Sequence, residues 1–246
     1  MEPCCAQVRC LRVHVPDTLH INRFDVCQRS ICARSSQALP LHLNKNAMNQ
    51  KSHALAGIAA PLLFVGAYLL AAAARPEFNH FTKAVSELGS LHAPNAVFWN
   101  ILGFICPGLL IAFFAVGFHQ AVTPNGEGRL PFYALLLSGI LLGVAGLFPD
   151  DFEHNASFTA IMHATGNFGS FIAFLIAAFT YPLYLRKSDF WEKTIVPSLT
   201  FTWLCILSGF LRTGLAPGIS QRVGFVFYFL WIAFMAINLF RYQRFS

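Results

Sequence analysis

Charged side chains are scarce in this sequence. Only 11% of its 246 residues are Asp, Glu, Lys or Arg, whereas soluble domains carry roughly 25%. Apolar residues make up 56% of the chain, and 26 residues are Phe. A surface this poor in charge excludes an ordinary water-soluble domain and indicates that most of the exterior faces lipid.

Paired cysteines with the spacing of a zinc site are also missing. Of the seven Cys, five lie within the first 32 residues, and the other two, Cys106 and Cys205, sit inside apolar runs. Small, polarisable side chains of this kind pack well against lipid-facing helices. The cysteines therefore predict neither a disulfide framework nor a zinc-binding module.

The net charge of +6 does not indicate a nucleic-acid partner. The basic residues bracket hydrophobic runs instead of forming a continuous basic face, which is the pattern of membrane topology signals. We expect membrane lipid as the surrounding partner and no nucleic acid.

Six apolar runs are long enough to cross a hydrocarbon layer, which takes about 20 helical residues. The predicted spans are residues 54–74, 96–122, 131–148, 163–184, 195–211 and 223–240. The sequence therefore predicts an all-α, polytopic integral membrane protein with six transmembrane helices in one bundle. Gly139 and Gly143 form a small-xxx-small pair that lets two helices approach closely.

The first 47 residues differ from the rest, because they are polar, contain Arg and Cys, and lack a long apolar run. We expect this segment to be disordered or a spurious extension, with Met48 as the true start. The membrane domain would then comprise residues 48–246.

An even number of spans places both termini on the same side of the membrane. On this topology every Lys and Arg lies on that side except Arg75, Lys83, Arg212 and Arg222. Without the residues before Met48 the balance is still seven against four. The positive-inside rule predicts cytoplasmic termini, and we expect a bacterial inner membrane.

The segment from Leu147 to His163 concentrates acids and imidazoles between two apolar runs. Polar groups so close to hydrocarbon are costly and tend to be functional. With the neighbouring non-cytoplasmic loops it predicts a polar mouth that binds a ligand. The candidate site residues are Ser86, Glu87, Asn100, Asp150, Asp151, His154, His163, Arg212 and Arg222.

Several interpretations of these residues stay open, among them a site for an anion or a lipid headgroup. Asp150 and Asp151 follow Pro149, as acids often do where a short interfacial helix begins. Glu87 is a candidate partner for Arg212 or Arg222 in a structural ion pair. No cofactor is expected; the alternative is zinc held by Asp150, His154 and His163.

Zinc binding by Asp150, His154 and His163 would require a particular path of the chain between the two histidines. In an unbroken helix the nine positions between His154 and His163 put the two rings on opposite sides, so a metal site needs a break between Asn155 and Thr159. We expect a continuous helix, with the two rings diverging.

Short motifs resemble those of a family of small bacterial membrane proteins, the domain of unknown function 998 family. They are Ser86-Glu87-Leu88-Gly89, Asn100, Gly146-Leu-Phe-Pro-Asp150 and His163. The resemblance covers Ala54 to about Phe240 and implies a six-helix fold and a membrane location, with no catalytic residues to carry over. A weaker likeness to alkaline ceramidases, which hold zinc near a membrane face, lacks their late paired His motif, because no His follows Tyr184.

The expected function is non-enzymatic. A small membrane protein would bind a lipid or small ligand at its polar mouth, or assist another membrane protein. The alternatives are a metal-dependent hydrolase acting on lipid at the outer face and a small transporter, which would need ionisable residues at mid-membrane.

Overall fold

A computed structural model describes residues 41–214 and 217–242, apart from the side chains of residues 41–49 and 211–217. This part of the chain is helical and contains no strand. The elements in chain order are α1 (Leu41–Ala73), η1 (Val85–Gly89), α2 (Ala96–Trp99), η2 (Asn100–Ile105), α3 (Cys106–Val122), α4 (Arg129–Leu147), α5 (Phe158–Thr180), α6 (Pro182–Leu185), α7 (Asp189–Glu192), α8 (Ile195–Gly214) and α9 (Pro217–Tyr242).

Six helical stretches are long and apolar enough to cross a membrane, as predicted. They are Gln50–Ala73, Ala96–Val122, Arg129–Leu147, Phe158–Leu185, Asp189–Phe210 and Gly218–Tyr242. Large apolar side chains such as Leu62, Leu109 and Val196 are more than half exposed on their outer faces. An exterior of this kind is stable only in lipid, so the chain is a multi-pass membrane protein.

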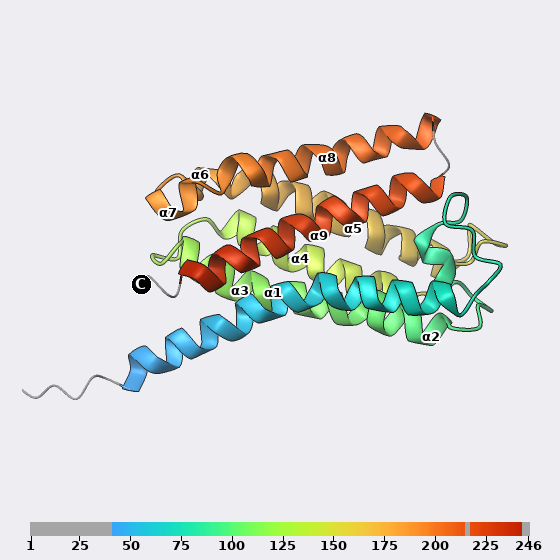
Figure 1. The fold of residues 1–246 in the computed structure, drawn as a ribbon, viewed down its shortest axis with the longest axis horizontal. Coiled ribbons are helices and arrows are strands. Elements are labelled where there is room, and N and C mark those ends of the chain that lie inside the picture. Colours follow the sequence, from blue (N-terminus) through green and yellow to red (C-terminus); the bar gives the residue numbers. More distant parts are fainter. Residues whose placement is uncertain (1–40, 215–216, 243–246) are drawn as a thin grey trace, which may run out of the picture. The chain divides into compact units, whose positions relative to one another are not determined.

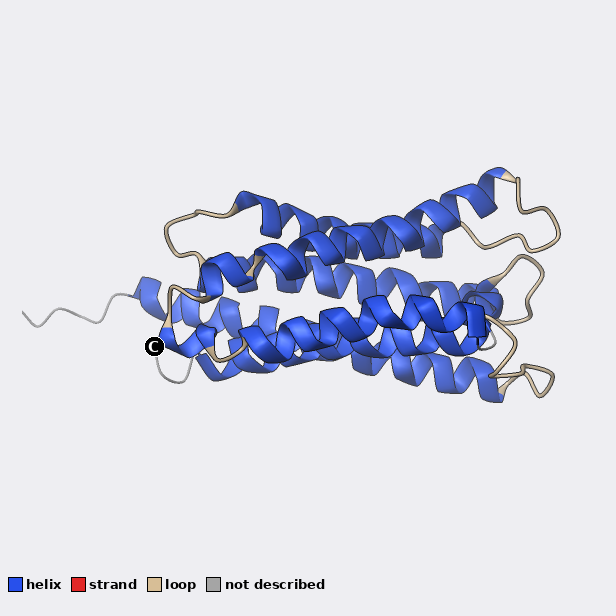
Figure 2. Ribbon diagram, turned by 90° about the horizontal axis from the view of Figure 1, so that it is seen from above, coloured by secondary structure: helices blue, strands red, loops and turns tan. Residues whose placement is uncertain are grey.

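The long helices pack in a definite order around the bundle (Figures 1 and 2). Helix α1 lies against α3 and α9, α3 also packs on α4, α4 shares its longest interface with α5, and α8 lies along α9. Helices α5 and α8, in contrast, touch over only a short stretch. The bundle is therefore loosely closed between α5 and the α8–α9 pair.

Glycines let the backbones of α3, α4 and α5 come into direct contact. A Cβ atom on Gly108 would lie 2.5 Å from the carbonyl oxygen of Gly139, and one on Gly139 would lie 2.5 Å from the oxygen of Gly108. A Cβ on Gly166 would lie 2.6 Å from the nitrogen of Ala145. The predicted close approach at the Gly139–Gly143 pair is confirmed, with α3 as the partner.

The second span contains a π-helical segment, η2, before Pro107. Proline has no N–H and its ring clashes with the carbonyl four residues earlier, here that of Gly103. The wider turn relieves this conflict, and Cys106 donates its N–H to Ile101, five residues back. The segment places Asn100 and Phe104 in the interior, at 5% and 0% exposure.

Three sequence predictions about local structure need correction. Residues 149–157 form a loop and not a short helix, because α4 ends at Leu147 and α5 begins at Phe158. The fourth span therefore starts earlier than residue 163, and the expected continuous helix from His154 to His163 is interrupted. The first helix also begins earlier than predicted, at Leu41 instead of residue 54.

Candidate functional site

Two long loops gather at one end of the bundle, residues 74–95 and 148–157 (Figure 1). They are joined directly, because the N–H of Leu91 donates to the carbonyl oxygen of Asp150 over 2.8 Å. The first turns of α9 lie beside them. Together these segments form the rim of the candidate site.

Helix α9 fixes the first of these loops through two consecutive side chains. The Arg222 guanidinium donates to the carbonyl oxygens of Lys83 (2.9 Å) and Gly218 (2.6 Å). The Gln221 Oε1 atom accepts the N–H of Val85 over 2.6 Å. Arg222 thus clamps the loop to α9 instead of facing a ligand.

The suggested ion pair between Glu87 and Arg222 is wrong. The Glu87 carboxylate accepts the N–H of Ala84 over 2.7 Å, and Arg75 donates to the Glu87 carbonyl oxygen over 3.0 Å. Glu87 therefore stabilises the turn of η1 from within. The side chain of Arg212, the other suggested partner, lies outside the described residues.

Asn100 supports the same loop from behind. Its Nδ2 atom donates to the Gly89 carbonyl oxygen over 2.8 Å, and a Cβ atom on Gly89 would collide with the Asn100 side chain. Asn100 is thus a buried structural contact for the Ser86–Gly89 motif and does not line the cavity described below.

The second loop separates the two acids. Asp151 accepts the N–H of His154 over 3.0 Å, and this hydrogen bond holds the pKa of its carboxyl below the ordinary value. The His154 ring lies beside Asp151 and its side chain is 76% exposed. Asp151 therefore closes the loop, with its side chain 13% exposed, and His154 faces solvent; neither residue lines the cavity described below.

Asp150 and His163, by contrast, come together at the loop end of the bundle. The His163 ring is 3% exposed. Its Nδ1 atom lies 2.8 Å from the carbonyl oxygen of Ala145 and 3.0 Å from that of Phe148. Because carbonyl oxygens only accept, Nδ1 carries the proton.

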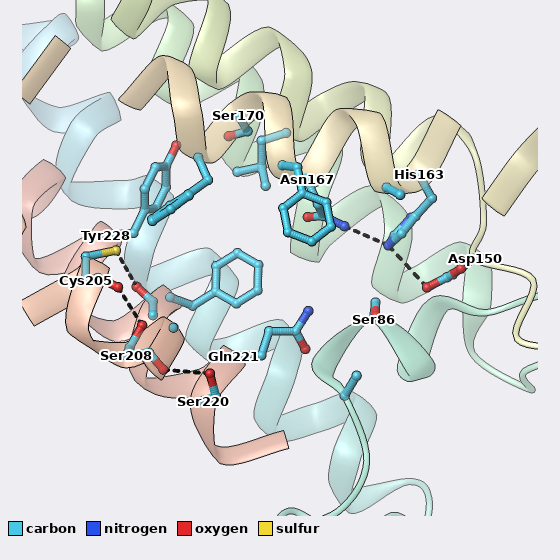
Figure 3. A pocket seen from close by; sticks show the side chains of 18 of the residues that line it. Ser86, Asp150, His163, Asn167, Ser170, Cys205, Ser208, Ser220, Gln221 and Tyr228 are labelled. Atoms are coloured by element: carbon cyan, nitrogen blue, oxygen red, sulfur yellow. Dashed lines mark hydrogen bonds and ion pairs between the residues drawn. The ribbon is translucent and has the colours of Figure 1, made fainter. Parts of the chain in front are cut away.

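The other ring nitrogen of His163 faces the cavity side of α5. Its Nε2 atom lies 2.7 Å from Nδ2 of Asn167 and 3.8 Å from Oδ2 of Asp150 (Figure 3). With the Asn167 amide oriented in this way, it donates to Nε2, and the imidazole is the neutral Nδ1–H tautomer. His163 is then a positioned hydrogen-bond acceptor beside a carboxylate.

A cavity of about 620 Å³ opens next to this pair, between α5 and the α8–α9 pair. Of the predicted site residues it brings together Ser86, Asp150 and His163. Figure 3 shows Ser86 and Gln221 approaching from the rim, opposite His163 and Asn167 on α5. The volume lies within the range of small-molecule and lipid sites.

Three hydroxyl side chains form a second polar cluster beside the deeper part of the cavity, and the sequence analysis did not predict it. The Ser138 hydroxyl lies 3.0 Å from the Tyr228 hydroxyl and 3.3 Å from that of Ser170. These bonds join α4, α5 and α9 in the membrane interior, where hydrogen bonds between helices stabilise packing. Around them the wall is apolar, with Leu142, Phe171 and other residues.

Sequence reasoning also missed Asn167, although a signal for it was present. His163, Asn167 and Ser170 are spaced i, i+4 and i+7, which places them on one face of a helix. A polar stripe on an otherwise apolar transmembrane helix faces the protein interior. That spacing would have predicted the α5 wall of the cavity.

The alternative zinc ligands do not converge. His154 lies with Asp151 and His163 lies with Asp150. Among the residues that the structure describes, no three His, Cys, Asp or Glu side chains lie close enough to hold a metal ion. At the loop end of the cavity, one carboxylate and one imidazole lie close together, those of Asp150 and His163.

Comparison with known proteins places the chain in a family. No curated protein and no solved structure matches it significantly. One family model matches residues 58–238, which is most of the chain and all six apolar spans in whole or in part. The chain therefore belongs to the family described as "Protein of unknown function (DUF998)".

Proposed function

We propose that this protein binds an amphiphilic molecule, a lipid or a small ligand with an apolar tail, in the cavity between α5 and the α8–α9 pair. It acts by binding and not by catalysis. The cavity itself carries this proposal, because Asp150 and His163 line it at the loop end, whereas apolar side chains such as Phe171 and Leu175 and a few uncharged hydroxyls line the rest.

The distribution of groups fits a molecule with a polar head and an apolar tail. Asp150, His163, Asn167, Ser86 and Gln221 surround the loop end, where Figure 3 shows them facing a common space. A few convergent polar groups on a mostly apolar surface are typical of ligand pockets. The head would lie among these side chains.

The tail would lie deeper, along apolar side chains of all three helices. Phe171 and Leu175 from α5 and Phe225 from α9 line this part of the cavity. At its margin Phe168 on α5 and Leu207 on α8 are 62% and 52% exposed. Because α8 touches α5 over only a short stretch, a lipid can enter sideways from the membrane.

The distribution of Lys and Arg between the two ends of the bundle supports one orientation of the protein in the membrane. The loops that carry the cavity rim belong to the side that is poor in Lys and Arg, and the opposite side holds Arg129, Arg186 and Lys187. By the positive-inside rule the termini are cytoplasmic and the cavity opens near the outer face. We place the protein in a bacterial inner membrane.

A metal-dependent hydrolase and a transporter each require groups that this site provides only in part. A metal-dependent lipid hydrolase needs about three protein ligands, and only Asp150 and His163 meet within the described residues. A transporter driven by ions typically has ionisable side chains at mid-membrane. Here Asp150 lies in a loop at the end of the bundle.

Blocking the cavity tests the proposal. Gly209 lines the cavity, and a Cβ atom there would meet nothing within 4 Å. Gly209→Trp therefore fills the space without a backbone clash. Gly66→Trp is the matched control, because Gly66 on α1 is equally open and lies outside the cavity lining.

The measurement is native mass spectrometry of the full chain released from detergent after purification from membranes. We expect the unmodified protein and Gly66→Trp to retain a lipid-sized adduct and Gly209→Trp to lose it. Equal retention by all three proteins would place the lipid on the outer surface and overturn the proposal.

A further inference from the structure

We infer that the head of the ligand is a cation, an alkylammonium group held by Asp150 and by aromatic rings that line the same cavity. This inference rests on the proposed amphiphile site and specifies the chemistry of that site. It follows from the charges and rings that line the cavity.

The cavity carries an uncompensated negative charge. Asp150 and His163 are the ionisable side chains near its loop end, and no Lys or Arg lines it within the described residues. With the Asn167 amide oriented to donate to Nε2, and with Nδ1 donating to carbonyl oxygens, His163 adds no positive charge. The Asp150 carboxylate then repels a bound anion.

The Asp150 carboxylate is also available for a ligand. Its side chain is 18% exposed, and the nearest group in an ion-pair geometry is His163 Nε2 at 3.8 Å. Within the described part of the chain no hydrogen bond to its carboxylate oxygens is formed. A partly buried carboxylate without partners is costly, and an ammonium group offsets that cost.

Aromatic rings complete a site for a cation. Phe152, in the same loop as Asp150, and Phe168, on α5, line the cavity. The faces of such rings attract ammonium groups, and cages of this kind are used to bind quaternary ammonium ligands. The hydroxyl oxygen of Ser86 adds a neutral acceptor to the lining.

Clamping of the rim keeps these groups in place without adding positive charge to the cavity. The Nε and Nη1 atoms of Arg222 donate to the Tyr68 hydroxyl and to the carbonyl oxygens of Lys83 and Gly218, while Nη2 is buried without a hydrogen-bond partner. Arg222 does not line the cavity.

The test compares three amphiphiles that share a dodecyl chain. They are dodecyltrimethylammonium, the neutral dodecyldimethylphosphine oxide and the anionic dodecyl phosphate. Saturable binding of each is measured near neutral pH to the full chain in phosphatidylcholine nanodiscs, with empty nanodiscs as the blank. Free tetramethylammonium, which has no tail, distinguishes recognition of the head alone from recognition of the whole amphiphile.

We expect the ammonium amphiphile to bind roughly tenfold or more tightly than the other two, the usual effect of one charge-assisted contact. Asp150→Asn should remove most of this preference, because the variant lacks the carboxylate that distinguishes the cation from the other two amphiphiles. Asp151→Asn is the matched control, because its carboxylate is adjacent in sequence and outside the cavity lining. It should retain the preference.

The possible failures are distinguishable. If no amphiphile binds saturably, or if Gly209→Trp changes the binding of none, the proposed function fails. If the neutral or anionic amphiphile binds as well as the cation, or if Asp150→Asn keeps the preference, the cation inference is overturned while the amphiphile site stands.

Discussion

The Nδ1 atom of His163 lies 2.8 Å from the carbonyl oxygen of Ala145, eighteen positions earlier in the chain. The same Nδ1 atom lies 3.0 Å from the carbonyl oxygen of Phe148. Carbonyl groups at the end of a helix have no N–H donor within the helix, and His163 supplies that donor for α4. A single imidazole thus caps α4, orients Asn167 and stands beside Asp150. His163 therefore both stabilises the end of α4 and forms part of the candidate site.

Replacing this imidazole should destabilise the bundle. His163→Ala leaves buried carbonyl oxygens without their donor, which costs about 1–3 kcal/mol. Thr165→Val is the control two positions away, because Thr165 is exposed and its hydroxyl bonds only within α5, to Ile161. We expect a lower melting temperature in detergent for His163→Ala and an unchanged one for Thr165→Val. Equal melting temperatures would show that the cap is dispensable.

The glycine contact between α3 and α4 makes a second prediction about stability. Gly108→Leu would push a side chain against the backbone of Gly139 and Gly143, which lies 2.5–2.7 Å from the added Cβ. Overpacking of this kind costs roughly 1–3 kcal/mol or more. Gly66→Leu, which meets nothing within 4 Å, is the control. Unfolding midpoints should fall for Gly108→Leu alone; similar midpoints would mean that the helices can separate freely.

The six helices of the fold were predictable because a helix that crosses lipid needs a long run of apolar residues. Every span must satisfy its backbone internally and present apolar side chains, so hydropathy locates the six helices. The Gly139–Gly143 pair was predictable for the same reason, since small residues on an apolar helix have few other roles.

The candidate site was predicted only in part. Ser86, Asp150 and His163 do meet at one cavity, because they flank spans that end on the same side. The contacts of Glu87 with Ala84 and of Arg222 with Lys83 were not predictable, because these partners are backbone atoms of a loop. The path of that loop depends on tertiary contacts such as Leu91 to Asp150. The cavity arises from the short contact between α5 and α8, a property that neither helix shows alone.

Acidification should affect the loop that carries Asp150. The pKa of Asp151 is lowered from its ordinary value of 3.8, chiefly by the hydrogen bond from the His154 N–H. A lowered pKa in the folded state stabilises the protein above the unfolded value, and this contribution disappears as the pH falls through the folded value. The difference in melting temperature between the unmodified protein and Asp151→Asn should therefore shrink as the pH is lowered below about 3.8. A difference that stays constant over that range would assign the effect of the substitution to something other than charge.

The orientation can be tested by labelling single cysteines with an impermeant maleimide. The seven native Cys are first replaced, and cysteines are then introduced one at a time at Asn155, Asn125 and Asp189, which are all exposed. Asn155 lies in the loop beside the cavity, whereas Asn125 and Asp189 lie at the opposite end of the bundle, in the links after α3 and before α8. Because that opposite end carries the larger share of Lys and Arg, it should be cytoplasmic. Intact cells should therefore label Asn155→Cys, and the other two variants should react only after permeabilisation. Labelling in the reverse pattern would turn the cavity mouth toward the cytoplasm and restrict its ligands to molecules of the inner leaflet.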